Sequence, residues 1–235
     1  MSTVLITDLI DADQLAKTAA GDLALELGRL LDSQKSVNLV LTGGTVGTKV
    51  LSELAPLVSN LELERLFLWW GDERFVDPAN SERNFIQARE ALLSRIHIPE
   101  ANIQAMPSTA DGELLEASKA FGERLESKSP VFDIVLLGMG ADGHVASLFP
   151  GSKPIEFGSW LVAELDSPKP PQQRISMSYE ALSSAKQVWF LVAGADKAPA
   201  VSRVFDGDDL PATKVTGKEL TKWYMDQAAA SGITS

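Results

Sequence analysis

The residue best suited to acid–base chemistry in this chain is a histidine inside a glycine-rich segment. Of the two histidines, His144 closes the run Gly138-Met139-Gly140-Ala141-Asp142-Gly143-His144, whereas His97 lies in an expected loop and is interpreted as structural. The unperturbed pKa of histidine suits proton transfer near neutral pH, and Asp142 is placed either to orient the ring or to cap the short helix that follows. These residues alone favour a catalytic base and a hydrogen-bonded turn histidine about equally.

A second glycine-rich turn, Thr42-Gly43-Gly44-Thr45, follows an apolar run and leads into a helical pattern. Gly43 and Gly44 allow a ligand to approach the backbone closely, and the start of a helix presents free N–H groups to a phosphate. The other interpretation is a plain strand-to-helix turn with Thr45 as its N-cap residue. The turn has the spacing of neither the dinucleotide fingerprint nor the Walker loop, so it indicates no nucleotide by itself.

Charged residues follow a third apolar run, in Gly71-Asp72-Glu73-Arg74. A functional site here needs one carboxylate, Asp72 or Glu73, and one guanidinium turned into a cleft. Arg74 would then hold an anion or a sugar oxygen in fork geometry. Three consecutive charged residues more often form a solvated loop with a surface ion pair. Arg83 and Arg89, on the expected next helix, are interpreted as surface residues.

Two further cations follow other parts of the expected sheet. Arg174 comes after a proline-rich loop at 168–171, and Lys197 ends the segment Gly194-Ala195-Asp196-Lys197. A lysine that follows a strand, close to the start of a helix, suits a phosphate, although an isolated lysine usually lies on the surface. The chain has a formal net charge of -11, so an anionic substrate requires a local group of cations and N–H groups.

The elements that must position these residues alternate along the chain. Continuous apolar runs predict buried strands, and residues at helical spacing predict helices between them. The expected strands are 4–6, 37–41, 66–70, 131–137, 161–165, 174–178 and 188–193, and the expected helices include 114–125 and a last one over about 219–230. Because no β-hairpin signature is found, the pattern predicts one α/β domain over residues 1–235, with a mostly parallel sheet covered by helices on both faces. Ligands of such sheets bind at the carboxyl ends of the strands, where the three glycine segments lie.

The composition excludes several classes of mechanism. There is no cysteine, and the two histidines are far apart in the sequence, so disulfides, thiol nucleophiles and a catalytic zinc site are not expected. No Gly-x-Ser-x-Gly elbow is present, which argues against a serine hydrolase. The acidic balance argues against nucleic acid as a partner. No signal peptide or membrane span is recognised, and we expect a cytoplasmic protein.

Taken in order, these segments resemble the 6-phosphogluconolactonases of the glucosamine-6-phosphate isomerase/6-phosphogluconolactonase family. The resemblance rests on the segments 42–45, 72–74, 138–151, 170–176, 192–197, 210–212 and 223–229, and so covers nearly the whole chain. The long glycine–histidine segment is specific, whereas the Gly-Gly-Thr turn alone is weak. The resemblance implies the Rossmann-like fold shared with glucosamine-6-phosphate deaminase and ribose-5-phosphate isomerase.

The same resemblance implies hydrolysis of 6-phospho-D-glucono-1,5-lactone to 6-phosphogluconate in the oxidative pentose phosphate pathway, with no metal and no organic cofactor. His144 would be the base that activates water, and Asp72 and Arg74 would line the site. The phosphate end or nearby oxygens would be bound by Gly43, Gly44, Thr45, Arg174 and Lys197. Either Asp142 or Asp72 would orient His144, and the sequence leaves that choice open.

The chain departs from the family pattern at a few positions. Serine is frequent where Thr42 stands, and proline is usual at Ala141 and after the Gly-Gly-Thr turn, where this chain has Val46-Gly47. These changes fit the same backbone role. Arg83 precedes Asn84 where many members have serine, and it is left outside the expected site.

Two other functions remain as alternatives to the lactonase. A deaminase or isomerase of amino-sugar phosphates would use the same fold, and a sugar-phosphate sensor would have kept the fold without turnover. The partner expected for the lactonase is a small sugar-phosphate lactone, with neither nucleic acid nor membrane involved. The expected assembly is a monomer or a weak homodimer.

Overall fold

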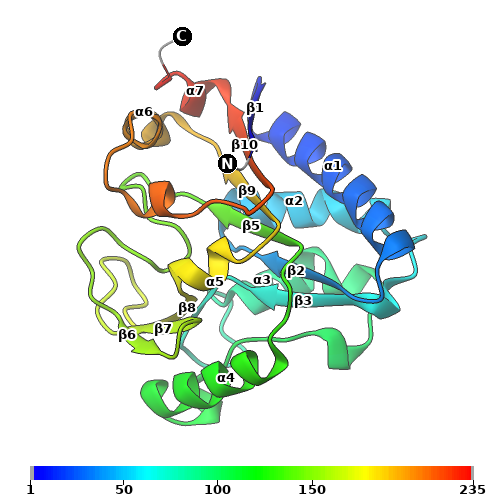
Figure 1. Ribbon diagram of the computed structural model, residues 1–235, viewed down its shortest axis with the longest axis vertical. Coiled ribbons are helices and arrows are strands. Elements are labelled where there is room, and N and C mark those ends of the chain that lie inside the picture. Colours follow the sequence, from blue (N-terminus) through cyan, green and yellow to red (C-terminus); the bar gives the residue numbers. More distant parts are fainter. Residues whose placement is uncertain (1–2, 234–235) are drawn as a thin grey trace.

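The computed structural model describes residues 3–233, and a six-stranded parallel sheet forms its centre (Figure 1). The strand order is β1-β10-β9-β5-β2-β3. The strands are β1 (Thr3–Leu9), β2 (Val37–Leu41), β3 (Leu66–Trp70), β5 (Ile134–Gly138), β9 (Gln187–Val192) and β10 (Leu220–Asp226). Every residue of β2 is buried, as expected for a strand covered on both faces. The predicted α/β class with a mostly parallel sheet is therefore confirmed.

Helices lie on both faces of the central sheet. The helices of the protein are α1 (Ala12–Ser33), α2 (Gly44–Leu57), α3 (Asn84–Ala91), α4 (Leu114–Lys128), α5 (Tyr179–Ser183), α6 (Ala198–Phe205) and α7 (Gln227–Ala230), of which α4 packs on the second sheet described below. In Figure 1, α1 and α2 lie on one side of the sheet, with α5 and α6 on the other. The sequence determines α1 locally: Asp11 caps it by accepting from the backbone N–H groups of Asp13 and Gln14, and its leucines at helical spacing are buried. Within residues 3–233, no helix combines the length and the apolar character needed to cross a bilayer.

A second, antiparallel sheet adjoins the first and was not expected. Its order is β4-β8-β7-β6, with β4 (Asp72–Arg74), β6 (Ile155–Phe157), β7 (Leu161–Glu164) and β8 (Arg174–Met177). β6 and β7 form a hairpin, although no hairpin signature is found in the sequence. The connection Gly158-Ser159-Trp160 is not one of the two-residue turns that mark a hairpin in sequence. Only Gly71 separates β3 from β4, so one segment of chain passes directly from the first sheet to the second.

The end of the chain corrects another expectation. The predicted helix over 219–230 is instead strand β10 followed by the short helix α7. β10 lies between β1 and β9 and pairs with both in parallel register. Trp223 stacks on Phe190 of β9 with ring centroids 3.9 Å apart. Pairing on two sides, together with aromatic packing, decides the conformation here, and neither is visible in a local window of sequence.

Candidate active site

The carboxyl ends of the central strands open into one cleft of about 370 Å³. Of the residues predicted for the site, all but Asp142 line this cleft: Gly43, Gly44, Thr45, Asp72, Arg74, His144, Arg174 and Lys197. Asn84 and Lys169, which were not predicted, line it as well. Residues that are far apart in the sequence meet here because parallel strands end at the same edge of the sheet.

The glycine-rich segment after β5 folds into a tight turn that presents His144. The N–H of Gly140 donates to the His144 carbonyl at 2.9 Å, and the N–H of Gly143 donates to the Gly140 carbonyl at 3.0 Å. Gly143 has a φ of +81°, a conformation that favours glycine. A Cβ atom at Gly140 would lie 2.0 Å from Nδ1 of His144, so the ring occupies space that only glycine leaves free.

Asp142 is the carboxylate that contacts His144. Its Oδ1 lies 2.5 Å from Nδ1 of the imidazole. An ionised carboxylate can only accept, so Nδ1 carries the proton and the lone pair of a neutral ring resides on Nε2. Burial lowers the pKa of His144 and outweighs the opposite effect of Asp142, which keeps the ring in its basic form near neutral pH. The ring packs against Phe149, with centroids 4.7 Å apart.

Asp72 has other partners. It is buried, and its Oδ2 accepts from the hydroxyl of Ser147 at 2.6 Å. Its Oδ1 accepts from the side-chain amide of Asn84 at 3.1 Å. Of the two carboxylates considered for the histidine, Asp142 therefore makes the direct contact, and Asp72 is held by neighbouring side chains. Ser147 was missed from sequence although it lies in the segment 138–151, because a serine three residues after the histidine has many possible roles.

Two arginines face each other across the second sheet at the edge of the cleft. Arg74 of β4 pairs in register with Arg174 of β8. Nη1 of Arg74 donates to Oδ1 of Asn84 at 2.8 Å and to the carbonyl of Glu82. Arg174 is buried and donates to the backbone carbonyls of Lys169, Pro170 and Pro171. Burial lowers the pKa of the Arg174 guanidinium. Because like charges opposite each other repel, this pair favours an anion beside it.

The start of α2 forms another wall of the cleft. Its N-cap residue is Gly43, and no side chain caps its first N–H groups. The interpretation of Thr45 as N-cap is therefore wrong. Lys197 also lines the cleft, and its Nζ lies 2.9 Å from Oδ2 of Asp196. The positive charge of Lys169 acts on His144 by lowering its pKa. The loop that contains Lys169 was read only as proline-rich, so this cation was not predicted.

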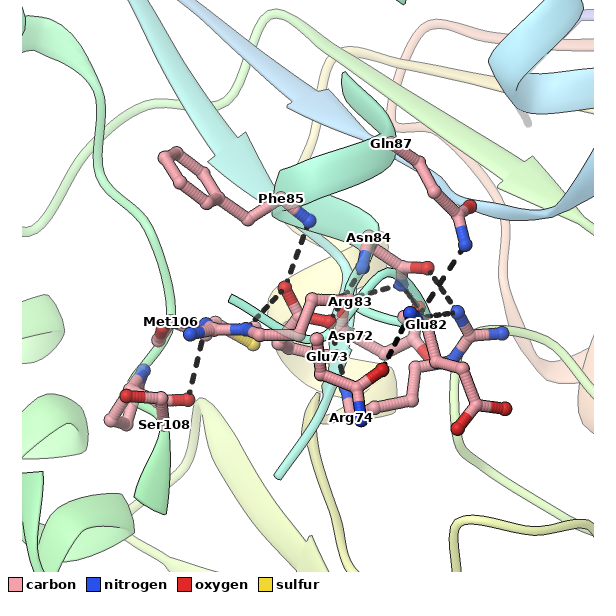
Figure 2. A network of polar contacts seen from close by, with 12 residues as sticks. Asp72, Glu73, Arg74, Glu82, Arg83, Asn84, Phe85, Gln87, Met106 and Ser108 are labelled. Carbon is pink, nitrogen blue, oxygen red and sulfur yellow. Dashed lines mark hydrogen bonds and ion pairs between the residues drawn. The ribbon is translucent and has the colours of Figure 1, made fainter. Parts of the chain in front are cut away.

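The prediction of Arg83 as a surface residue is also wrong. Arg83 is 4% exposed, and its Nε lies 3.4 Å from Oε2 of Glu73, which is fully buried (Figure 2). Burial raises the pKa of Glu73, and the charge of Arg83 opposes this effect. Isolated charged residues in a sequence usually lie on the surface, and only the tertiary structure reveals that these two form a buried pair.

Among residues 3–233, no group of three or more His, Cys, Asp or Glu side chains is placed to hold a metal ion.

A parallel sheet whose strand ends carry a histidine–carboxylate pair and several cations is typical of α/β enzymes that act on anionic substrates. The chain matches the family model described as glucosamine-6-phosphate isomerases/6-phosphogluconolactonase over residues 10–223. It therefore belongs to that family, as the sequence motifs predicted, and the prediction of an enzyme is confirmed with it.

Individual relatives agree with this assignment. The chain is 36% identical to a 6-phosphogluconolactonase of Mycobacterium tuberculosis, with 96% of each chain covered. It is 38% identical to one of Streptomyces coelicolor, over 95% of this chain and 92% of the other. The crystal structure of a 6-phosphogluconolactonase from Thermotoga maritima superposes with a TM-score of 0.86 at 27% identity, covering 96% of this chain and all of the other. A monomeric glucosamine-6-phosphate deaminase, at 20% identity and a TM-score of 0.81, shares the fold.

Proposed function

We propose that this enzyme hydrolyses 6-phospho-D-glucono-1,5-lactone to 6-phospho-D-gluconate, the lactonase step of the oxidative pentose phosphate pathway. The observation that carries the proposal is the basic imidazole of His144, held by Asp142 and open to a cleft that also contains Arg74, Arg174 and Lys197. A base beside a group of cations suits water attack on an ester of an anionic sugar. The names of the relatives at 36–38% identity support the same substrate.

The proposed reaction needs one base and one reactive water. Nε2 of His144 removes a proton from water while the water oxygen bonds to the lactone carbonyl carbon. The carbonyl oxygen becomes an oxyanion, which Arg74 or nearby backbone N–H groups stabilise. When the oxyanion collapses, the ring C–O bond breaks, and the imidazolium of His144 returns its proton to the departing sugar oxygen. The product acid then loses its proton to solvent. Asp142 stabilises the transient imidazolium throughout, since its charge favours the protonated ring.

The phosphate of the substrate would bind at the start of α2. Uncapped N–H groups beginning at Gly44 carry the positive end of the helix dipole, and no atom from another part of the chain lies within 4 Å of the position that a Cβ of Gly44 would take. Lys197 and Arg174 supply positive charge from other parts of the cleft lining. Asp72, held by Ser147, would accept a hydrogen bond from a sugar hydroxyl. Together these groups would place the lactone carbonyl near His144, and positioning of this kind supplies much of the rate.

The decisive experiment measures hydrolysis of freshly generated 6-phosphogluconolactone above its spontaneous rate. We expect a large preference over the unphosphorylated lactone. His144→Ala should lose most turnover while still binding phosphate. His97→Ala is the matched control, because this second histidine is exposed and outside the cleft.

Near-normal kcat in His144→Ala would refute the assigned base. Ammonia release from glucosamine 6-phosphate, without lactone hydrolysis, would favour the deaminase alternative. Binding of sugar phosphate without turnover would favour a sensor.

The monomer or weak homodimer expected from the sequence remains a prediction, and gel filtration at several protein concentrations tests it.

A further inference from the structure

We propose that Asn84 is a positioning residue that fixes Arg74 and Asp72 relative to the Gly-Gly-Thr turn, and that Glu73 and Arg83 hold Asn84 in place. The inference rests on the proposed function, since it assigns Arg74 and Asp72 their orientation for that reaction. Asn84 is the first residue of α3 and was not singled out from sequence. It is only 2% exposed, although it borders the cleft.

The side chain of Asn84 contacts Arg74 and Asp72, as Figure 2 shows, and it also contacts the Gly-Gly-Thr turn. Oδ1 of Asn84 accepts from Nη1 of Arg74 at 2.8 Å. Nδ2 of Asn84 donates to the carbonyl oxygen of Asp72 at 2.9 Å and to its carboxylate Oδ1 at 3.1 Å. The amide also packs on the phosphate-binding turn: a Cβ atom at Gly43 would lie 1.8 Å from Oδ1 of Asn84. Gly43 is therefore required by this contact with Asn84.

The chemistry of the partners determines which way the amide points. A guanidinium only donates hydrogen bonds, and a carbonyl or carboxylate oxygen only accepts them. The oxygen of Asn84 must then face Arg74, and its nitrogen must face Asp72. Aspartate at position 84 would place a second carboxylate against Asp72, and leucine would satisfy neither partner. Asparagine meets both requirements at this size.

A buried carboxylate holds Asn84 from behind. Oε1 of Glu73 accepts from the backbone N–H of Asn84 at 2.7 Å and from that of Arg74 at 2.8 Å. Oε2 accepts from the N–H of Phe85 at 2.9 Å. Glu73 thus caps α3, whose N-cap residue makes no side-chain cap. Because the same carboxylate binds β4 and α3, it sets the spacing between Arg74 and Asn84.

Arg83 completes this support. Its Nε approaches Glu73, and its Nη2 donates to the carbonyl of Met106 at 2.7 Å, which ties the ion pair to a distant loop (Figure 2). The charged groups around Asn84 are therefore Asp72 and Arg74 on the cleft side and Glu73 and Arg83 behind it. If the amide is removed, Arg74 loses its bond to Asn84 and keeps the one to the Glu82 carbonyl, so its guanidinium is held less firmly.

The test compares Asn84→Ala with Asn102→Ala. Asn102 is a buried asparagine outside the cleft, and its amide donates to the backbone carbonyls of Glu64 and Leu66. Both variants lose a buried amide of the same size, so both should lower Tm. We expect only Asn84→Ala to lower kcat/KM, by about 10- to 100-fold, as for loss of one or two hydrogen bonds to charged groups. Equal kinetics in the two folded variants would overturn the proposal.

Two further variants separate positioning from a merely structural role. If Asn84 acts through Arg74, the double variant Asn84→Ala/Arg74→Ala should be little slower than Arg74→Ala alone. Fully multiplicative losses would overturn that route. Asn84→Asp keeps the shape and the acceptor for Arg74 and so covers the case in which the alanine variant does not fold. It should still lose at least about tenfold in kcat/KM, because it turns the donor to Asp72 into a like charge. Native kinetics in Asn84→Asp would contradict the proposal.

These outcomes are distinct from failure of the proposed function. If the native enzyme does not hydrolyse the lactone, the proposed function fails before any variant is compared. If the native enzyme is active and Asn84 variants match it, only the positioning inference fails.

Discussion

Asp142→Asn isolates the contribution of charge at the histidine pair. Asparagine has the same size and keeps an oxygen that can accept from Nδ1 of His144, so the 2.5 Å contact loses its charge and little else. Hydrogen bonds to charged groups contribute about 1.5–3 kcal/mol. The Asp142 side chain is 39% exposed, so solvent screening favours the lower half of that range. A loss of about 1.5–2 kcal/mol from the transition state lowers kcat roughly 10- to 30-fold.

The pH dependence gives a second, independent readout. Burial lowers the pKa of His144 from its ordinary 6.5, and Asp142 raises it by a smaller amount. The acid limb of kcat/KM in the native enzyme should therefore have its midpoint below 6.5, since the ring must be unprotonated to act as base. Removing the charge of Asp142 removes an effect that favours the protonated ring. The midpoint of the variant must then move to still lower pH.

The assay is initial-rate lactone hydrolysis across the acid range, corrected for spontaneous hydrolysis. Asp32→Asn, a change on the exposed face of α1, is the control for loss of one negative charge. An unchanged kcat in Asp142→Asn, or an acid limb displaced to higher pH, would refute the role given to Asp142.

Three further predictions follow from the same contacts. Arg83→Met leaves Glu73 buried without its cation and should lower the free energy of unfolding by about 3–5 kcal/mol in urea titrations. Burial already raises the pKa of Glu73, so its carboxylate takes up a proton at acidic pH, and the loss of unfolding free energy should become smaller there. A loss that becomes larger on acidification would contradict the prediction. Gly140→Ala places a methyl group 2.0 Å from Nδ1 of His144 and should abolish most turnover, because the ring must move away. A normal kcat in this variant would contradict the prediction. Lys197→Met should raise KM several-fold with little change in kcat, because Lys197 binds the phosphate equally in the substrate and in the transition state. A fall in kcat with an unchanged KM would show that Lys197 has a different role.

Much of the fold could be predicted because its signals are local. The strands β2 and β3 begin and end where the apolar runs 37–41 and 66–70 do. The helix α1 follows from a capping aspartate and leucines at helical spacing. Local signals failed where partners distant in the sequence decide. The segment 220–226 is a strand because β1 and β9 pair with it. Strands were predicted over 161–165 and 174–178, but their pairing in a separate antiparallel sheet with β4 and β6 is not visible in either segment.

The candidate site divides in the same way. The sequence by itself determined the glycine turns, the scarcity of histidine that singled out His144, and the family, because these depend on residue type and spacing. Only the tertiary structure decided that Asp142 rather than Asp72 contacts the imidazole, and that Glu73 and Arg83 are buried as a pair behind Asn84. The physical reason is that a side chain's burial and partners depend on which strands end beside it. That arrangement is a property of the whole sheet, and no single segment contains it.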